Sequence, residues 1–161
     1  MQAALPSARS LIALAGAGSA FLLLAALTFQ AAGYAPCELC IYQRWPHLAA
    51  AVIAAAALFL RLPARLMTVL GAVAAAVAAG LAIYHTGVEL RWWAGPSACS
   101  ASTNIANLSV QDLMAQINAA PLVRCDEVAW SLFGISMAGW NAAASVGLMV
   151  VWMAAAVQAR R

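Results

Sequence analysis

Apolar residues fill three long runs of the chain, at 11–29, 66–84 and 135–157. A helix needs roughly 20 apolar residues to cross the hydrocarbon core of a bilayer. Each run has about that length, so each predicts a transmembrane helix. The stretch GAVAAAVAAG in the second run consists of small residues, which allow helices to approach closely in lipid.

A fourth apolar run, 48–60, spans only about 20 Å as a helix and cannot cross alone. Its helix must begin near Ile41, which places Gln43, Arg44 and His47 at or just inside the membrane boundary. Polar groups at that depth need a partner, water or a function. We predict an all-α membrane protein, a single domain over 1–161, whose four transmembrane helices lie at about 11–29, 41–60, 66–84 and 135–157.

The composition agrees with this reading, since 66% of the residues are hydrophobic and only 8% are charged. Soluble domains are about half apolar and a quarter charged. The first run could instead be a cleaved signal peptide, because Arg9 precedes it and the small residues AAG follow it. Its length exceeds the hydrophobic core of about 7–15 residues of such peptides, which favours a retained helix.

Arginines mark one side of the four-helix topology: Arg9, Arg61, Arg65, Arg160 and Arg161. The positive-inside rule makes that side, with both termini, cytoplasmic. The other side carries every acidic residue and every cysteine: Glu38, Glu89, Asp112, Asp126, Glu127, Cys37, Cys40, Cys99 and Cys125. We therefore expect a short outer loop at 30–40 and a long one at 85–134.

The long outer loop contains LSVQDLMAQIN, which has the pattern of a short amphipathic helix. Ser109 is a suitable N-cap, and Leu113, Met114 and Ile117 fall on one face. We expect this helix to lie on the membrane surface. A loop of this length is usually functional.

Four cysteines outside the cytoplasm meet an oxidising compartment, and they admit three uses: structural disulfides, a metal site or disulfide exchange. A bond between Cys99 and Cys125 could serve structure or exchange. Zinc sites usually join two closely spaced ligand pairs, and the wide separation of Cys99 from Cys125 disfavours metal. His47 and His85 could ligate, but a lone histidine near an interface more often serves as a hydrogen-bonding residue.

Cys37 and Cys40 form a C-x-x-C pair, whose ring is too small to stabilise much but which commonly holds a thiol of lowered pKa. We expect Pro36 in the first turn of a helix, whose N-terminus favours a thiolate. If that helix continues, Cys37, Cys40, Arg44 and His47 form one stripe, with Arg44 one turn from Cys40. Alternatively, Pro46 starts the membrane helix.

These residues resemble the disulfide bond formation protein B (DsbB) family. PCELCIYQRW matches its most specific motif, C-x-L-C-I-Y-x-R, and the order of the cysteines and the expected helices also agree. YHTGVE is a weaker match that suggests His85 near a quinone, and VRCDEVAWSLFGISMAGWN is similar to the segment that leads into the last helix. Gln43 stands where the best-known member has an acidic residue.

The resemblance implies a quinone-dependent thiol:disulfide oxidoreductase of the bacterial inner membrane that supports protein folding in the periplasm. A DsbA-like thioredoxin-fold partner attacks Cys99 and releases Cys125, and electrons then pass through a Cys37–Cys125 bond to Cys37–Cys40. Cys40, beside Arg44, donates to ubiquinone or menaquinone. His47 and His85 are candidates for handling the quinone's protons.

Two other functions are compatible with the residues. One is a quinone reductase similar to vitamin K epoxide reductase, but that family places its C-x-x-C pair near its last helix, whereas here the pair follows the first. The other is a non-enzymatic membrane subunit with structural disulfides. In each case the lipid bilayer is the environment, and we expect no nucleic acid partner.

Overall fold

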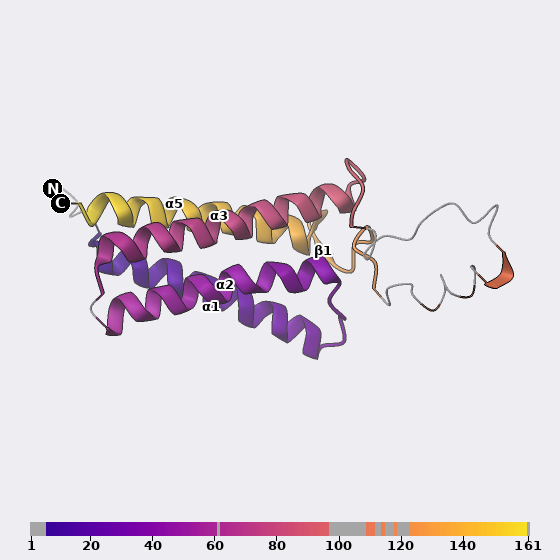
Figure 1. Cartoon of the computed structure of the whole chain (residues 1–161), viewed down its shortest axis with the longest axis horizontal. Helices are drawn as coiled ribbons and strands as arrows, with labels where there is room; N and C mark the ends of the chain where they lie inside the picture. Colours follow the sequence, from indigo (N-terminus) through magenta and orange to yellow (C-terminus); the bar gives the residue numbers. More distant parts are fainter. Residues whose placement is uncertain are drawn as a thin grey trace.

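The computed structural model describes residues 6–60, 62–96, 109–111, 114, 118 and 123–160. Within these ranges it is built from long helices and one hairpin (Figure 1). The helices are α1 (Ala8–Ala31), α2 (Glu38–Phe59), α3 (Ala64–Glu89) and α5 (Met137–Gln158). The strands are β1 (Ser131–Leu132) and β2 (Ile135–Ser136).

Small polar side chains start three of the helices. Ser7 caps α1 by accepting from the amide of Ser10, and Ser136 caps α5 by accepting from the amide of Gly139. In α2 the cap is a sulfur, because the Cys37 side chain accepts from the amide of Cys40. The expectation that Pro36 lies in the first helical turn is therefore wrong: Cys37 takes the capping position, and the helix begins after it.

Three of these helices, α1, α3 and α5, are long and apolar enough to cross a membrane, as judged by length and composition over the described residues. Helix α2 is not among them, since it carries Glu38, Gln43, Arg44 and His47 in its first half. Pro46 lies inside α2 and does not start it, so the alternative in which the helix begins at Pro46 is wrong.

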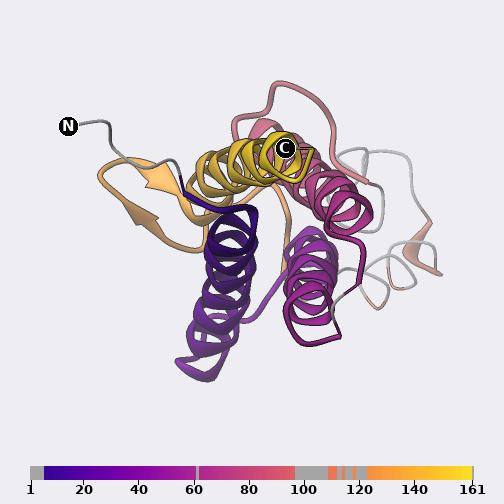
Figure 2. The same ribbon diagram turned by 90° about the vertical axis from the view of Figure 1, so that its left-hand side faces the viewer.

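The four helices form a bundle in which α1 packs against α2, α2 against α3, α3 against α5 and α5 against α1 (Figure 2). Helices α1 and α3 lie diagonally across it and barely touch. Helix α1 begins and α5 ends at the same end of the bundle, while the segments containing Cys37 and Cys125 lie at the other end (Figure 1). The segment between α1 and α2 and residues 123–136 therefore lie at the same end of the bundle.

Small residues let the helices pack closely in the half of the bundle remote from the cysteines. The core cluster there is rich in alanine and surrounds one large side chain, Trp152, which is fully buried. A Cβ added to Gly71 would come within 2.5 Å of the Trp152 ring. The absence of a side chain at Gly71 is thus what admits the indole between α3 and α5.

The short hairpin of β1 and β2 turns at Phe133 and Gly134, which both have positive φ values of 52° and 77°. Positive φ at both central residues is the geometry of tight hairpin turns. The hairpin leads directly into α5, where the Ser136 hydroxyl donates to the Glu89 carboxylate at the end of α3. This hydrogen bond joins the cysteine-side ends of α3 and α5.

The expected amphipathic surface helix lies mostly outside the described residues. Of its residues, Ser109, Val110, Gln111, Met114 and Asn118 are described, and all five are exposed.

Replacing Gly71 with alanine should lower the stability of the bundle by about 1–3 kcal/mol, the usual cost of forcing an atom into a packed core. The matched change Gly80→Ala meets no atom within 4 Å, so it should be neutral or slightly stabilising. Thermal unfolding of both variants in detergent would compare them. Equal melting temperatures for the two would contradict the packing described for Trp152.

Candidate active site

The first turn of α2 brings two thiols together. Cys37 and Cys40 are both free, and the Cys37 sulfur lies 2.9 Å from that of Cys40, toward which it donates. The amide of Cys40 donates in turn to the Cys37 sulfur at 3.3 Å. The hydrogen bond to Cys40, together with burial, raises the pKa of Cys37 above its ordinary value. The same hydrogen bond lowers the pKa of Cys40 to about 7, so Cys40, near the positive end of the helix dipole, is the more acidic thiol of the pair.

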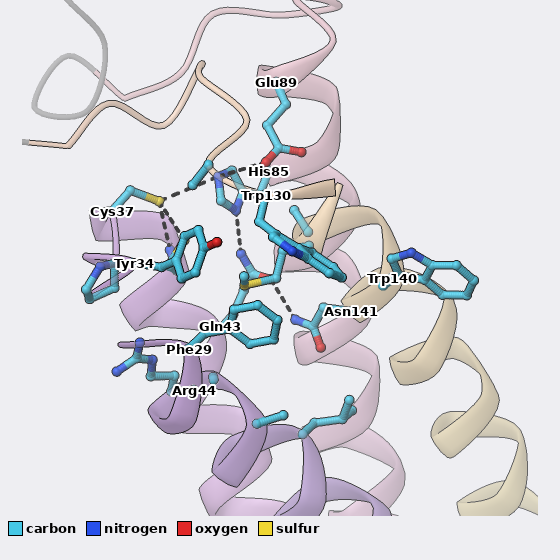
Figure 3. A pocket seen from close by; sticks show the side chains of 18 of the residues that line it. Phe29, Tyr34, Cys37, Gln43, Arg44, His85, Glu89, Trp130, Trp140 and Asn141 are labelled. Carbon is cyan, nitrogen blue, oxygen red and sulfur yellow. Dashed lines mark hydrogen bonds and ion pairs between the residues drawn. The ribbon is translucent and has the colours of Figure 1, made fainter. Parts of the chain in front are cut away.

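A cavity of about 530 Å³ opens beside this turn (Figure 3). Its wall on the α1 side is apolar and includes Phe21 and Phe29, while its polar groups gather near the cysteines. Those polar groups are Cys37, Cys40, Gln43, Arg44, His47, His85, Glu89, Arg124, Glu127 and Asn141. The volume is in the range of small-molecule sites, and a mostly apolar wall with a few convergent polar groups suits an amphipathic ligand.

His85, on α3, connects this wall to the cysteines. Its Nε2 atom lies 3.6 Å from the Cys37 sulfur, and its Nδ1 atom lies 2.7 Å from the side-chain nitrogen of Gln43. The ring is also hydrogen-bonded to the backbone of Cys125. Since His85 is only 3% exposed, these contacts replace water around the imidazole.

The same hydrogen-bonded group extends into α5. The Asn141 amide nitrogen donates to the Gln43 carbonyl oxygen at 2.6 Å, and the Asn141 oxygen lies 2.9 Å from Nε2 of His47. Gln43 and His47 are both buried. Three helices thus supply a continuous line of polar side chains through an otherwise apolar bundle.

Arg44 faces the cavity from α2 but turns toward α1. Its Nη1 atom donates to the Gln30 side-chain oxygen at 2.6 Å. Its Nε atom is buried and has no hydrogen-bond partner among the described residues. We expected Arg44 directly beside the Cys40 thiolate, but no hydrogen bond or ion pair joins the two in the described part of the chain. Arg44 therefore acts on Cys40 through space and has a donor left for a ligand.

Glu89 closes the outer end of the cavity. One carboxylate oxygen accepts from Ser136, and the other lies 4.0 Å from Nε2 of His85. The Glu89 side chain is largely buried, so its carboxyl group lies inside the site, beside His85 and Ser136.

Cys125 is buried and disulfide-bonded, and it packs in one cluster with Cys37, Leu39 and Val88. The neighbouring Arg124 and Asp126 form a two-point ion pair with separations of 2.9 and 2.6 Å, which lowers the pKa of Asp126. This ion pair constrains the backbone on both sides of Cys125. Cys99, the other cysteine expected in the long loop, lies outside the described residues.

The sulfurs of Cys37 and Cys40 and a ring nitrogen of His85 lie within 4.8 Å of one another, close enough for a metal ion. Structural zinc sites usually use four ligands, and this group supplies three among the described residues. It is the nearest approach to a metal centre in that part of the chain.

The structure thus brings together most of the residues that the sequence singled out. Cys37, Cys40, Arg44, His47 and His85 line one cavity, and Cys125 packs against Cys37 behind it.

Sequence reasoning missed Asn141 and Glu89. The sequence could have identified Asn141, because a polar residue inside an apolar span is usually functional or paired. The indication for Glu89 is weaker: it lies four residues after His85, on the same helix face.

Comparison with known proteins places this arrangement in a family. The model of the family "Disulfide bond formation protein DsbB" matches residues 8–155. The "Uncharacterized protein RP370" of Rickettsia prowazekii (strain Madrid E) is 32% identical over 119 residues, which cover 73% of this chain and 69% of that protein. No solved structure matches the chain. With its apolar helices and its paired thiols, the chain belongs to the disulfide bond formation protein DsbB family, as a multi-pass membrane oxidoreductase of disulfide formation.

Proposed function

We propose that this protein reoxidises a DsbA-like dithiol protein of the periplasm and passes the electrons to a membrane quinone. The observation that carries the proposal is the C-x-x-C pair at the start of α2, in the wall of a mostly apolar cavity of about 530 Å³. A quinone partitions into lipid, so its reductant must sit at the bilayer boundary. Thiols in an apolar-walled cavity between helices meet that requirement.

The proposed topology has four spans, with α2 as the fourth and with the cysteines facing the periplasm across the inner membrane. Two observations support it. Helix α2 runs alongside α1 and α3 within one bundle. Arg9 and Arg65 belong to the first turns of α1 and α3 and Arg160 follows the end of α5, and these helix ends lie opposite the cysteine-bearing segments (Figure 1), in agreement with the positive-inside rule.

In the first step, a partner thiolate attacks Cys99 of a Cys99–Cys125 disulfide, and the Cys125 thiolate leaves. The second partner thiol then attacks the mixed disulfide, which leaves the partner oxidised and both loop cysteines reduced. The loop thiols are reoxidised by the Cys37–Cys40 disulfide through a transient Cys37–Cys125 bond. The packing of Cys125 in one cluster with Cys37 supports this exchange, because it needs little movement.

In the last step, the thiols of Cys37 and Cys40 give two electrons and two protons to the quinone and become a disulfide again. Arg44 is suited to stabilise the negative charge that develops on the quinone oxygen, since its buried Nε lacks a partner. His85 and Glu89 lie where they could pass protons between the sulfurs and the acceptor. His47 is three hydrogen bonds away from His85, through Gln43 and Asn141, so its role is to support the polar line.

The direct test combines the purified protein, a reduced DsbA-like protein and ubiquinone or menaquinone, and follows the loss of quinone absorbance. We expect one quinone reduced for each partner disulfide formed, and we expect Cys40→Ser to abolish the reaction. Intact structural disulfides with no quinone consumed would contradict the proposal and favour a non-enzymatic membrane subunit.

Cys125→Ser should trap a mixed disulfide between Cys99 and the partner, because the free Cys99 thiol attacks the disulfide of an oxidised partner and no Cys125 thiol is present to displace it. On a non-reducing gel, the variant incubated with the oxidised partner would show a band at the summed mass of the two proteins, and dithiothreitol would remove that band. Cys37→Ser is the matched control: it leaves Cys99 and Cys125 in place and should give no such band with the resting protein. Equal adducts from both variants would overturn the assigned order of cysteines.

Arg44→Ala should raise the KM for quinone by about tenfold or more, since a charge-assisted hydrogen bond contributes about 1.5–3 kcal/mol. Both disulfides should still form. Arg160→Ala, which removes an equal charge at the remote end of the bundle, should leave the KM unchanged. Steady-state kinetics against quinone concentration would measure both variants, and an unaltered KM for Arg44→Ala would remove this residue from the site.

A further inference from the structure

The orientation of the Gln43 side chain is fixed by a group that can only accept hydrogen bonds. Its nitrogen, Nε2, lies 3.2 Å from the backbone oxygen of Leu39 and 2.7 Å from Nδ1 of His85. A carbonyl oxygen has no proton to give, so the atom that faces Leu39 must be the amide nitrogen. The two protons of that nitrogen then serve Leu39 and His85.

Asn141 secures the other end of the amide. Its nitrogen donates to the Gln43 oxygen at 2.6 Å, and its own oxygen faces Nε2 of His47 at 2.9 Å and the Ser145 hydroxyl at 3.4 Å. Turning the Gln43 amide over would set its oxygen against the Leu39 carbonyl and its nitrogen against the Asn141 nitrogen, and turning the Asn141 amide over would set its oxygen against the Gln43 oxygen. Gln43 and Asn141 therefore hold each other in one orientation.

This orientation decides where His85 carries its proton. Because Gln43 donates to Nδ1, that nitrogen must offer its lone pair, and a neutral imidazole then has its proton on Nε2. Nε2 faces the Cys37 sulfur at 3.6 Å, and Cys37 donates to Cys40. Asn141, Gln43, His85 and Cys37 thus form one line of contacts (Figure 3), and the backbone of Cys125 also hydrogen-bonds the His85 ring.

We propose that Gln43, held by Asn141, is a positioning residue that keeps His85 neutral with its proton on Nε2, the nitrogen that faces the Cys37 sulfur. An imidazolium would point a second N–H at the Gln43 donor, so the arrangement also disfavours protonation of the ring. The catalytic consequence rests on the proposed function; the tautomer does not.

The ionisable groups around His85 agree with this assignment. On α3, the Glu89 carboxylate lies 4.0 Å from Nε2 and favours a proton there. Cys37 and Cys40 face the ring end from α2, and Arg124 and Glu127 line the same cavity from the segment before β1. Helix α5 contributes Asn141, which does not titrate. Helix α1 contributes only uncharged residues to the cavity.

The test is nitrogen NMR on the reduced, ¹⁵N-histidine-labelled protein in detergent. The chain has two histidines, so a His47→Gln sample assigns both sets of signals. We expect His85 to show a protonated Nε2 and an unprotonated Nδ1. Gln43→Glu replaces a donor with a group that accepts, and it should move the proton onto Nδ1 or protonate both nitrogens. A wild-type His85 with its proton on Nδ1, or a Gln43→Glu spectrum identical to the wild type, would overturn the proposal.

Gln30→Glu is the matched control, because it makes the same chemical change on α1, beside Arg44 and not beside His85. It should leave the His85 signals in place. If Gln43→Glu fails to fold, Gln43→Met keeps the side-chain length without its hydrogen bonds and should give a mixture of His85 tautomers. A single Nε2-protonated form in Gln43→Met would also overturn the proposal.

A functional readout separates this inference from the proposed function. In Gln43→Glu, the pH profile of quinone reduction should move to higher pH by about one unit, since a carboxylate favours the protonated ring. An unshifted profile would overturn the role of Gln43 in the reaction. The predicted NMR result in a protein that reduces no quinone would overturn the proposed function while upholding the tautomer.

Discussion

The structure of the site depends on the cap that the Cys37 sulfur places on the first turn of α2. This hydrogen bond, from the amide of Cys40, starts the helix at Glu38 and sets two sulfurs 2.9 Å apart at its positive end. From that start the helical repeat carries Gln43, Arg44 and His47 into the same cavity. Facing lipid, these polar side chains would be costly.

The apolar surroundings give these few polar groups their strength. In a low-dielectric wall, a hydrogen bond or a charge acts more strongly than in water, and an unpaired group costs more. The hydrogen-bonded side chains from Asn141 to Cys37 avoid this cost, because each buried donor among them is paired with an acceptor. Under the proposed function, the electron acceptor must also be a strong oxidant. A disulfide with an ordinary reduction potential, below about −300 mV, would have to oxidise a partner whose potential is near −120 mV, at a cost of roughly 8 kcal/mol.

Much of the fold could be predicted from the sequence, because three apolar runs are long enough to cross a bilayer and the structure has helices at each of them. The cluster around Cys37 and Cys40 was also accessible, since helical spacing alone puts Arg44 and His47 on their face. The partners from other helices were not. Whether Asn141 meets Gln43, or Arg44 turns to Gln30, depends on how each helix is rotated in the bundle, and side-chain packing between helices decides that.

The central claim is that a quinone binds in the cavity beside the α2 cysteines. Photolabelling with an azido-quinone in lipid, followed by peptide mapping with mass spectrometry, tests it most directly. The account predicts labels on the first turns of α2 and the last turns of α3, in the segments around Cys40 and His85, and competition by unmodified quinone. Labels confined to the opposite end of the bundle, around Met67 and Trp152, would contradict it.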